Sequence, residues 1–220
     1  MIHEDIERLR FITEMRVQQK KVLKYCLHMQ NAGRHDEASS CARDFIKEVA
    51  MILVTREKRN FLSLLSILYD VACQTGEERY ALGVLEIASE KIQMIASKGS
   101  WSPLPVNDST PLYQKAGLLA QRLPNGLEDA YRYFWLACEA VSPPGCEMPA
   151  LAKEKADVHA CAKSISDEMV KIDRRSADEW SKRSVWHDFK MRELDPTRDW
   201  DAAKARNAGY GWPLHEGVRS

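Results

Sequence analysis

The placement of proline constrains the fold of this 220-residue chain more than any other feature of its sequence. No proline precedes Pro103, and seven of the nine prolines lie between Pro103 and Pro149. Because proline breaks the interior of a helix, the first hundred residues can form long helices, whereas the middle of the chain must be interrupted. No segment alternates polar and apolar residues with β-branched enrichment. The sequence therefore predicts an all-α protein without a sheet.

Apolar residues at helical spacing, together with the glycines that follow them, predict where the helices begin and end. The first predicted helix covers residues 2–32, stops at Gly33, and carries an apolar stripe of Ile2, Ile6, Leu9, Leu23 and Leu27. A second helix is predicted to begin near residue 35 and to extend past Ile52. Further helices are predicted over residues 61–74, 77–97, 112–123, 127–141, 150–164 and 167–190. A final short helix is expected to start at Pro196, with Asp195 as its N-cap.

These signals divide the chain into four parts. Residues 1–98 are predicted to form N-terminal helical hairpins, and residues 99–111 to form a linker that contains three prolines. Residues 112–195 are predicted to form helical repeats with a cap, and residues 196–220 a short helix and tail. The sequence leaves open whether the hairpins and the repeats form one continuous solenoid.

Two glycines mark a pattern that recurs at an offset of 43 residues. Gly33 lies five residues before Ala38, and Gly76 lies five residues before Ala81. Glycine frees the chain to turn back, and a small alanine early in the next helix lets the two helices approach closely. The pattern indicates two related hairpins, although any pair of antiparallel helix hairpins could produce the same spacing.

A more specific pattern occupies residues 112–180. Residues 116–120 read AGLLA, and residues 125–137 read NGLEDAYRYFWLA. This small-residue helix, followed by a glycine-containing turn, Asp-Ala-Tyr, paired aromatics and a closing alanine, resembles the Sel-type branch of the tetratricopeptide-like repeats. Residues 156–180 look like the hairpin that caps such arrays. The sequence departs from the family at Asp129, where the preceding turn is short, and at residues 143–145, where Pro-Pro-Gly replaces a simple turn.

The resemblance implies a short α/α solenoid that binds protein partners through a helical surface, usually as a scaffold or adaptor and without catalysis. Physical reasoning favours the same architecture, because a helix pair has an apolar face that only stacking on a neighbouring pair can cover. An irregular helical bundle is the alternative.

Composition and charge narrow the class of protein further. Lys plus Arg and Asp plus Glu number 32 each, so no net charge indicates a nucleic-acid or membrane surface. The six cysteines are scattered without a C-x-x-C pair, which is typical of reduced thiols. The N-terminus enters a charged helix directly, and the most apolar stretch, residues 61–73, is too short to cross a bilayer. We therefore expect a soluble, cytoplasmic protein.

The residues that could carry chemistry do not form a motif in the sequence. Asp157, His159 and Cys161 are close together, but residues two apart on a helix point about 200° apart, so His159 cannot join the other two. His187 and Asp188 are adjacent and diverge in the same way. The sequence contains no phosphate-binding loop, paired-histidine helix or nucleophile elbow. No catalytic residue, cofactor or metal site is predicted.

We therefore expect a non-catalytic module, an adaptor, scaffold or inhibitor, that binds a protein partner. Five of the six tryptophans lie in the last 86 residues; Trp135 is expected in the core, whereas others could anchor an interface. The expected partner contacts are Trp186, Trp200, Tyr210 and Trp212. Alternatively, the tail folds back and uses Trp200 and Trp212 to seal the last helix pair.

Another hypothesis is a nucleic-acid-binding or regulatory protein, because a basic stripe at four-residue spacing could contact phosphates. The stripe consists of Arg16, Lys20 and Lys24. An enzyme with a dispersed site is the least favoured hypothesis. The partner, the process and the oligomeric state are left open.

Overall fold

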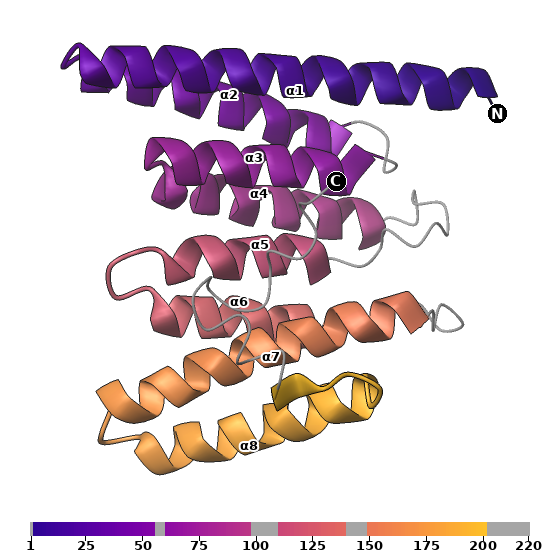
Figure 1. Ribbon diagram of the computed structural model, residues 1–220, viewed down its shortest axis with the longest axis vertical. Coiled ribbons are helices and arrows are strands. Elements are labelled where there is room, and N and C mark those ends of the chain that lie inside the picture. The colour runs from indigo at the N-terminus through magenta and orange to yellow at the C-terminus, as the bar shows by residue number, and fades with distance from the viewer. Residues whose placement is uncertain (1, 56–59, 98–109, 140–148, 202–220) are drawn as a thin grey trace. The chain divides into compact units, whose positions relative to one another are not determined.

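The computed structural model describes residues 2–55, 60–97, 110–139 and 149–201 (Figure 1). These residues form the helices α1 (Ile2–Asn31), α2 (His35–Thr55), α3 (Phe61–Thr75), α4 (Glu78–Ser97), α5 (Thr110–Gln121), α6 (Leu127–Glu139), α7 (Pro149–Ile172) and α8 (Ala177–Leu194). The described part of the chain contains no strand, which confirms the all-α prediction. None of its helices has the length and apolar character needed to cross a membrane.

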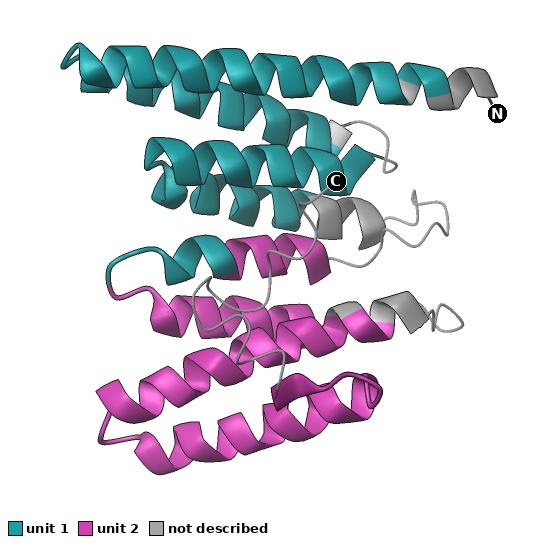
Figure 2. Cartoon of the chain, viewed as in Figure 1, with its two compact units in different colours: residues 1–106, 118–124 teal, residues 107–117, 125–220 magenta. Residues whose placement is uncertain are grey.

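The chain divides into two compact units (Figure 2). Unit 1 comprises residues 1–106 and 118–124, and unit 2 comprises residues 107–117 and 125–220. The predicted linker, residues 99–111, lies almost entirely outside the described residues.

The turns that end α1 and α3 in unit 1 are built alike. Gly33 and Gly76 both adopt left-handed backbone conformations, with φ of 73° and 78°. In both turns the residue after glycine donates its backbone N–H to the carbonyl oxygen five residues earlier, at 2.9 Å. Ala38 and Ala81, early in the helices that follow, are 2% and 0% exposed. The glycines thus supply the positive φ, and the alanines supply the close approach, that the sequence pattern predicts.

The helices of unit 1 contact one another in a regular order. Helix α1 packs on α2 and α3, α2 packs on α3 and α4, and α3 packs on α4. The core lies where α2 and α3 meet, and its fully buried side chains include Ile46, Val49, Leu64, Leu65 and Leu68.

A buried carboxylate connects α2 to the start of α4. Glu77, immediately before α4, accepts hydrogen bonds from the Ser39 hydroxyl at 2.5 Å and from Arg43 Nε at 2.7 Å. The Glu77 side chain is 6% exposed, whereas that of Arg43 is 51% exposed. Because a buried carboxylate needs polar partners, these two contacts hold the helices in register.

The apolar stripe predicted for α1 is wrong. Ile6, Leu9 and Leu27 are 57%, 64% and 59% exposed. Among the described side chains of α1, the buried ones are instead Met15, Gln19, Cys26 and Met29, and the side chain of Ile2 lies outside those that the structure describes. Apolar residues are distributed around this helix, so only its packing on α2 and α3 selects the face that is buried.

In unit 2, helix α7 packs on both α6 and α8. The prediction of a break between helices at residues 165–166 is wrong, because α7 continues to Ile172. Ile165 and Met169 are buried and extend the apolar stripe, while the Ser166 hydroxyl donates to the Ala162 carbonyl at 2.9 Å. The turn comes at residue 173 instead, where Asp173 Oδ1 accepts the backbone N–H groups of residues 175 and 176.

The start predicted for the last short helix is also wrong, since residues 196–197 form a turn and helical geometry begins at Trp200; the residues after 201 lie outside the described part of the chain. Trp200 is 2% exposed, and its indole N–H donates to the Asp195 carbonyl at 3.0 Å. The ring packs in a small apolar core with Ala156, Ala160 and Met191. The hydrogen bond to the Asp195 carbonyl therefore holds Trp200 against α7 and α8.

Candidate functional site

Three side chains with metal-ligand and proton-transfer chemistry meet inside unit 2, one from each of α6, α7 and α8. They are Cys138, His159 and His187, here called the His–His–Cys cluster, and their ligand atoms all lie within 4.8 Å of one another. His159 Nδ1 lies 2.9 Å from His187 Nδ1 and 3.5 Å from Cys138 Sγ. The buried faces of the three helices therefore carry polar groups where an ordinary core would be apolar.

The second ring nitrogen of His187 also has a partner. Its Nε2 lies 3.2 Å from the hydroxyl of Tyr131, a residue of α6. The contact between the two Nδ1 atoms requires that one carries a proton and the other does not. The tyrosine hydroxyl can donate or accept, so it can satisfy either tautomer of His187.

Burial keeps the imidazoles of the cluster neutral. His159 is 5% exposed and His187 is 0% exposed. Burial, followed by the positive charges of Lys190 and Lys155, lowers the pKa of His159 to about 4. Burial and the neighbouring His159 lower the pKa of His187 to about 3. Burial also raises the pKa of the Cys138 thiol to about 12, so the cluster carries no charge at neutral pH.

Two tryptophans pack against the imidazoles. The Trp186 ring lies 5.3 Å from the His159 ring and 4.8 Å from the His187 ring. Trp135 lies 6.0 Å from His187 and 5.2 Å from Trp186. The prediction that Trp135 is a core residue is wrong: Trp135 and Trp186 are each 37% exposed. They form a partly exposed aromatic pair that rests on a buried polar cluster.

The aromatic pair continues into an apolar surface along α8. Val185 and Phe189 lie four residues apart, on one face of the helix, and are 68% and 61% exposed. Phe189 also follows Trp186 by three residues, so its side chain is a neighbour of that ring. We call Trp135, Val185, Trp186 and Phe189 the aromatic patch.

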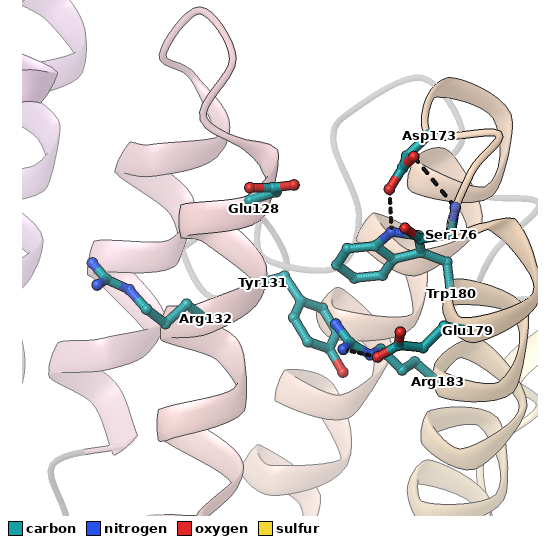
Figure 3. Close-up of a pocket in the computed structure, with 8 residues that line it drawn as sticks. All are labelled: Glu128, Tyr131, Arg132, Asp173, Ser176, Glu179, Trp180 and Arg183. Carbon is teal, nitrogen blue, oxygen red and sulfur yellow. Dashed lines mark hydrogen bonds and ion pairs between the residues drawn. The ribbon is translucent and has the colours of Figure 1, made fainter.

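Tyr131 also lines a pocket of about 370 Å³ (Figure 3). It is lined by Glu128, Tyr131, Arg132, Asp173, Ser176, Glu179, Trp180 and Arg183. The Arg183 guanidinium lies 4.5 Å from the Trp180 ring and 5.2 Å from the Tyr131 ring. The indole N–H of Trp180 donates to Asp173 Oδ2 at 3.3 Å. Charges of both signs line this pocket.

The predicted partner contacts have different environments. Trp186 is partly exposed and belongs to the aromatic patch, whereas Trp200 is buried and unavailable to a partner. Trp200 thus follows the alternative in which the tail seals the last helices. Tyr210 and Trp212 lie outside the described residues.

The predicted basic stripe lies on α1 in unit 1. Arg16 is engaged within the protein, where its Nη1 donates to Gln19 Oε1 at 3.0 Å and to Asp70 Oδ2 at 3.3 Å. Lys20 and Lys24 are exposed. The ion pair with Asp70 reduces the positive charge that the stripe offers to a phosphate.

The His–His–Cys cluster was not predicted from the sequence. His159 does diverge from its neighbours in the chain, as expected: Asp157 accepts a hydrogen bond from Arg198 at 2.6 Å. Its partners come from α6 and α8, 21 residues before it and 28 residues after it. The available signal was a histidine in the apolar stripe of each of two helices, which indicates that the two could meet in the core.

Comparisons with known proteins do not assign a family. No protein-family model and no curated protein matches the sequence. Among solved structures, one described as "DHF58 filament" is similar, with 18% sequence identity and a TM-score of 0.46 over 87% of this chain and 95% of that chain. A similarity this low carries no argument about function.

Proposed function

We propose that this protein is a non-catalytic helical-repeat module that binds a protein partner through the aromatic patch. The observation that carries the proposal is the aromatic pair of α6 and α8: Trp135 and Trp186 pack at 5.2 Å, and each is 37% exposed. Phe189 and Val185 extend this surface with side chains that are more than half exposed. Contiguous exposed apolar surface is typical of interaction sites, and tryptophan is enriched among the residues that dominate binding energy.

The cluster beneath the patch supports its role as an interface. The Trp186 ring contacts both imidazoles, which are hydrogen-bonded to each other, and His187 is also hydrogen-bonded to the Tyr131 hydroxyl. A ring fixed in this way loses little rotational freedom when a partner binds, and preorganisation of this kind increases affinity. The complementary partner is a protein segment with an apolar face, such as an amphipathic helix.

Two features of unit 1 support the repeat architecture. The helices that are adjacent in sequence are in contact, and so are α1 with α3 and α2 with α4, which is the order expected of stacked helix hairpins. The turns at Gly33 and Gly76, which lie 43 residues apart, have the same hydrogen bond and the same left-handed backbone conformation at glycine. The Sel-like pattern of residues 112–180 extends the proposal to unit 2.

Substitution of the most exposed patch residues tests the proposal. Phe189→Ala and Val185→Ala remove apolar surface without touching the core, and Met51→Ala, at a residue of α2 that is 60% exposed, is the matched control. Partners captured from the native host by the wild-type protein are identified by mass spectrometry and then purified. Titration of each purified partner against the variants follows.

We expect Phe189→Ala to weaken binding by roughly 10-fold or more, because truncation of a central apolar anchor costs about 2 kcal/mol. Met51→Ala is expected to bind as the wild type does. If Phe189→Ala and Val185→Ala leave the dissociation constant of every purified partner unchanged, or if Met51→Ala raises it as much as Phe189→Ala does, the aromatic patch is not the interface.

A further inference from the structure

We propose that the His–His–Cys cluster is a zinc site, in which Cys138 Sγ, His159 Nδ1 and His187 Nδ1 are the ligands. The three groups come from three different helices and converge within 4.8 Å. One cysteine and two histidines form a donor set that zinc, a borderline soft ion, binds well. The inference stands on this geometry alone and does not depend on the proposed partner-binding function.

The distances between the donor atoms fit a zinc ion. With Zn–N bonds of about 2.0–2.1 Å and a Zn–S bond of about 2.3 Å, a tetrahedral ion separates two nitrogens by roughly 3.3 Å and a nitrogen from a sulfur by roughly 3.6 Å. The two Nδ1 atoms are 2.9 Å apart, and His159 Nδ1 is 3.5 Å from Cys138 Sγ. The third pair, Cys138 and His187, has its ligand atoms within 4.8 Å. Admitting the ion therefore needs shifts of a few tenths of an ångström at the first two pairs and of up to about 1 Å at the third.

Zinc binding displaces one proton from the cluster. The Cys138 thiol releases its proton to solvent as the S–Zn bond forms. The imidazole that carries its proton on Nδ1 changes tautomer, so that both Nδ1 lone pairs face the ion and both Nε2 atoms carry protons. For His187, Nε2–H then donates to the Tyr131 hydroxyl, which lies 3.2 Å away. Such a partner on the second nitrogen orients a histidine ligand in most metal sites.

The burial of the cluster suits a neutral-imidazole site. Burial already holds both histidines in the neutral form that binds metal. One thiolate leaves the bound site with one net positive charge, and the charged groups that face it are mixed. The positive charge of the bound site is repelled by three basic side chains, Lys155, Lys190 and Arg183. The same positive charge is stabilised by two acidic side chains, Glu139 and Glu193.

Three protein ligands leave one coordination position, which a water molecule can fill. Cys138 is partly exposed, unlike the two histidines, so the ion and the water enter on the side of the thiol. Trp186 packs against both imidazoles, and its fluorescence therefore reports occupancy of the site.

Metal titration of the full-length protein tests the inference. Chelator-treated protein is titrated with Zn²⁺ by calorimetry and by tryptophan fluorescence, with Mg²⁺ as the ion that this donor set should reject. In parallel, Co²⁺ is added and the absorption spectrum is recorded. We expect one zinc ion per chain, no response to Mg²⁺, and a cobalt spectrum with intense tetrahedral ligand-field bands and a thiolate charge-transfer band.

The variants assign the ligands. Cys138→Ser and His187→Gln are expected to weaken zinc binding by at least about 100-fold, because loss of an outer partner alone costs about 10–100-fold. Tyr131→Phe is expected to weaken it by about 10-fold. The matched control is Cys73→Ser, which removes another partly buried thiol, in unit 1, and should bind zinc as the wild type does.

The inference is overturned if the wild type binds no zinc, or if Cys138→Ser binds zinc as tightly as the wild type. Should a variant fail to fold by circular dichroism, the cobalt spectrum of the wild type decides, because a spectrum without thiolate charge transfer excludes Cys138 as a ligand. A zinc site without any captured protein partner would refute the proposed function and leave this inference intact.

Discussion

Replacement of Gly117 by alanine tests the packing of α5 on α6 most directly. A Cβ atom at Gly117 would lie 2.9–3.0 Å from three carbon atoms of the Phe134 ring. The optimal separation of two carbon atoms is about 3.5–4.0 Å, so the ring or the helix would have to move by roughly half an ångström or more. Phe134 is 0% exposed, and its ring therefore has no free space to move into.

The magnitude follows from two opposed effects. Overpacking a well-packed core costs about 1–3 kcal/mol, whereas alanine gains about 1 kcal/mol over glycine within a helix. We expect Gly117→Ala to lower the free energy of unfolding by about 1 kcal/mol. Gly83→Ala is the matched control, since Gly83 lies inside α4 and a Cβ there meets no atom within 4 Å. That variant should gain about 0.5–1 kcal/mol.

Urea denaturation followed by circular dichroism measures both variants. Because five of the six tryptophans lie in the last 86 residues, tryptophan fluorescence reports chiefly on unit 2, where Gly117 and Phe134 lie. Phe134→Leu should remove the clash, so that Gly117→Ala becomes neutral or stabilising in that background. If Gly117→Ala stabilises the wild-type protein as much as Gly83→Ala does, the close contact between α5 and α6 is refuted.

Three further predictions concern stability. Gly76→Ala, at a φ of 78°, should cost about 1–2 kcal/mol in urea denaturation, because an L side chain is strained in the left-handed region, and an unchanged midpoint would contradict that geometry. Arg43→Ala should lower the midpoint of urea denaturation, since it leaves the buried Glu77 carboxylate without its cation, whereas Arg34→Ala, at an exposed ion pair, should leave the midpoint nearly unchanged. Equal midpoints for the two variants would contradict this reasoning. The third prediction is for chelator-treated protein, in which the folded-state pKa of His159 is about 4 and that of His187 about 3, below the value of about 6.5 for an unfolded chain. Below about pH 6.5 the unfolded state therefore binds more protons than the folded state. The free energy of unfolding is highest above about pH 6.5 and falls as the pH drops toward 4, by up to roughly 1.4 kcal/mol per pH unit for each histidine. A flat profile between about pH 7 and pH 5 in urea denaturation would contradict the burial of both histidines.

Local chemistry made most of the helix boundaries predictable. Prolines in the described middle of the chain lie outside helix interiors, with Pro111 and Pro149 in the first turns of α5 and α7 and Pro124 in the turn between α5 and α6. Gly33 and Gly76 follow the ends of α1 and α3, where the sequence predicts them. These effects act within a few residues, so they can be recognised without a tertiary structure. The break in α7 was mispredicted because Ser166 satisfies its hydroxyl within the helix. Asp173 instead accepts the backbone N–H groups of the turn before α8, from a position that resembles an ordinary polar loop.

The buried faces were harder to predict than the helices. Apolar residues surround α1, and the face that is buried is the one that α2 and α3 cover. Trp135 follows the helical apolar register, yet its ring lies at the edge of the core and stacks on Trp186. Exposure at such boundary positions depends on what the neighbouring helix offers, which periodicity does not record.

The sequence by itself determined an all-α chain, the positions of its glycine turns and the absence of a local catalytic motif, because each depends on residues within one or two helical turns. Only the tertiary structure decided that Cys138, His159 and His187 meet and that Trp200 is buried. The three members of the His–His–Cys cluster lie on three helices, 21 and 28 residues apart. Their convergence is fixed by how α7 packs between α6 and α8, and helix packing depends on the shapes of whole faces rather than on the spacing of residues along one chain segment.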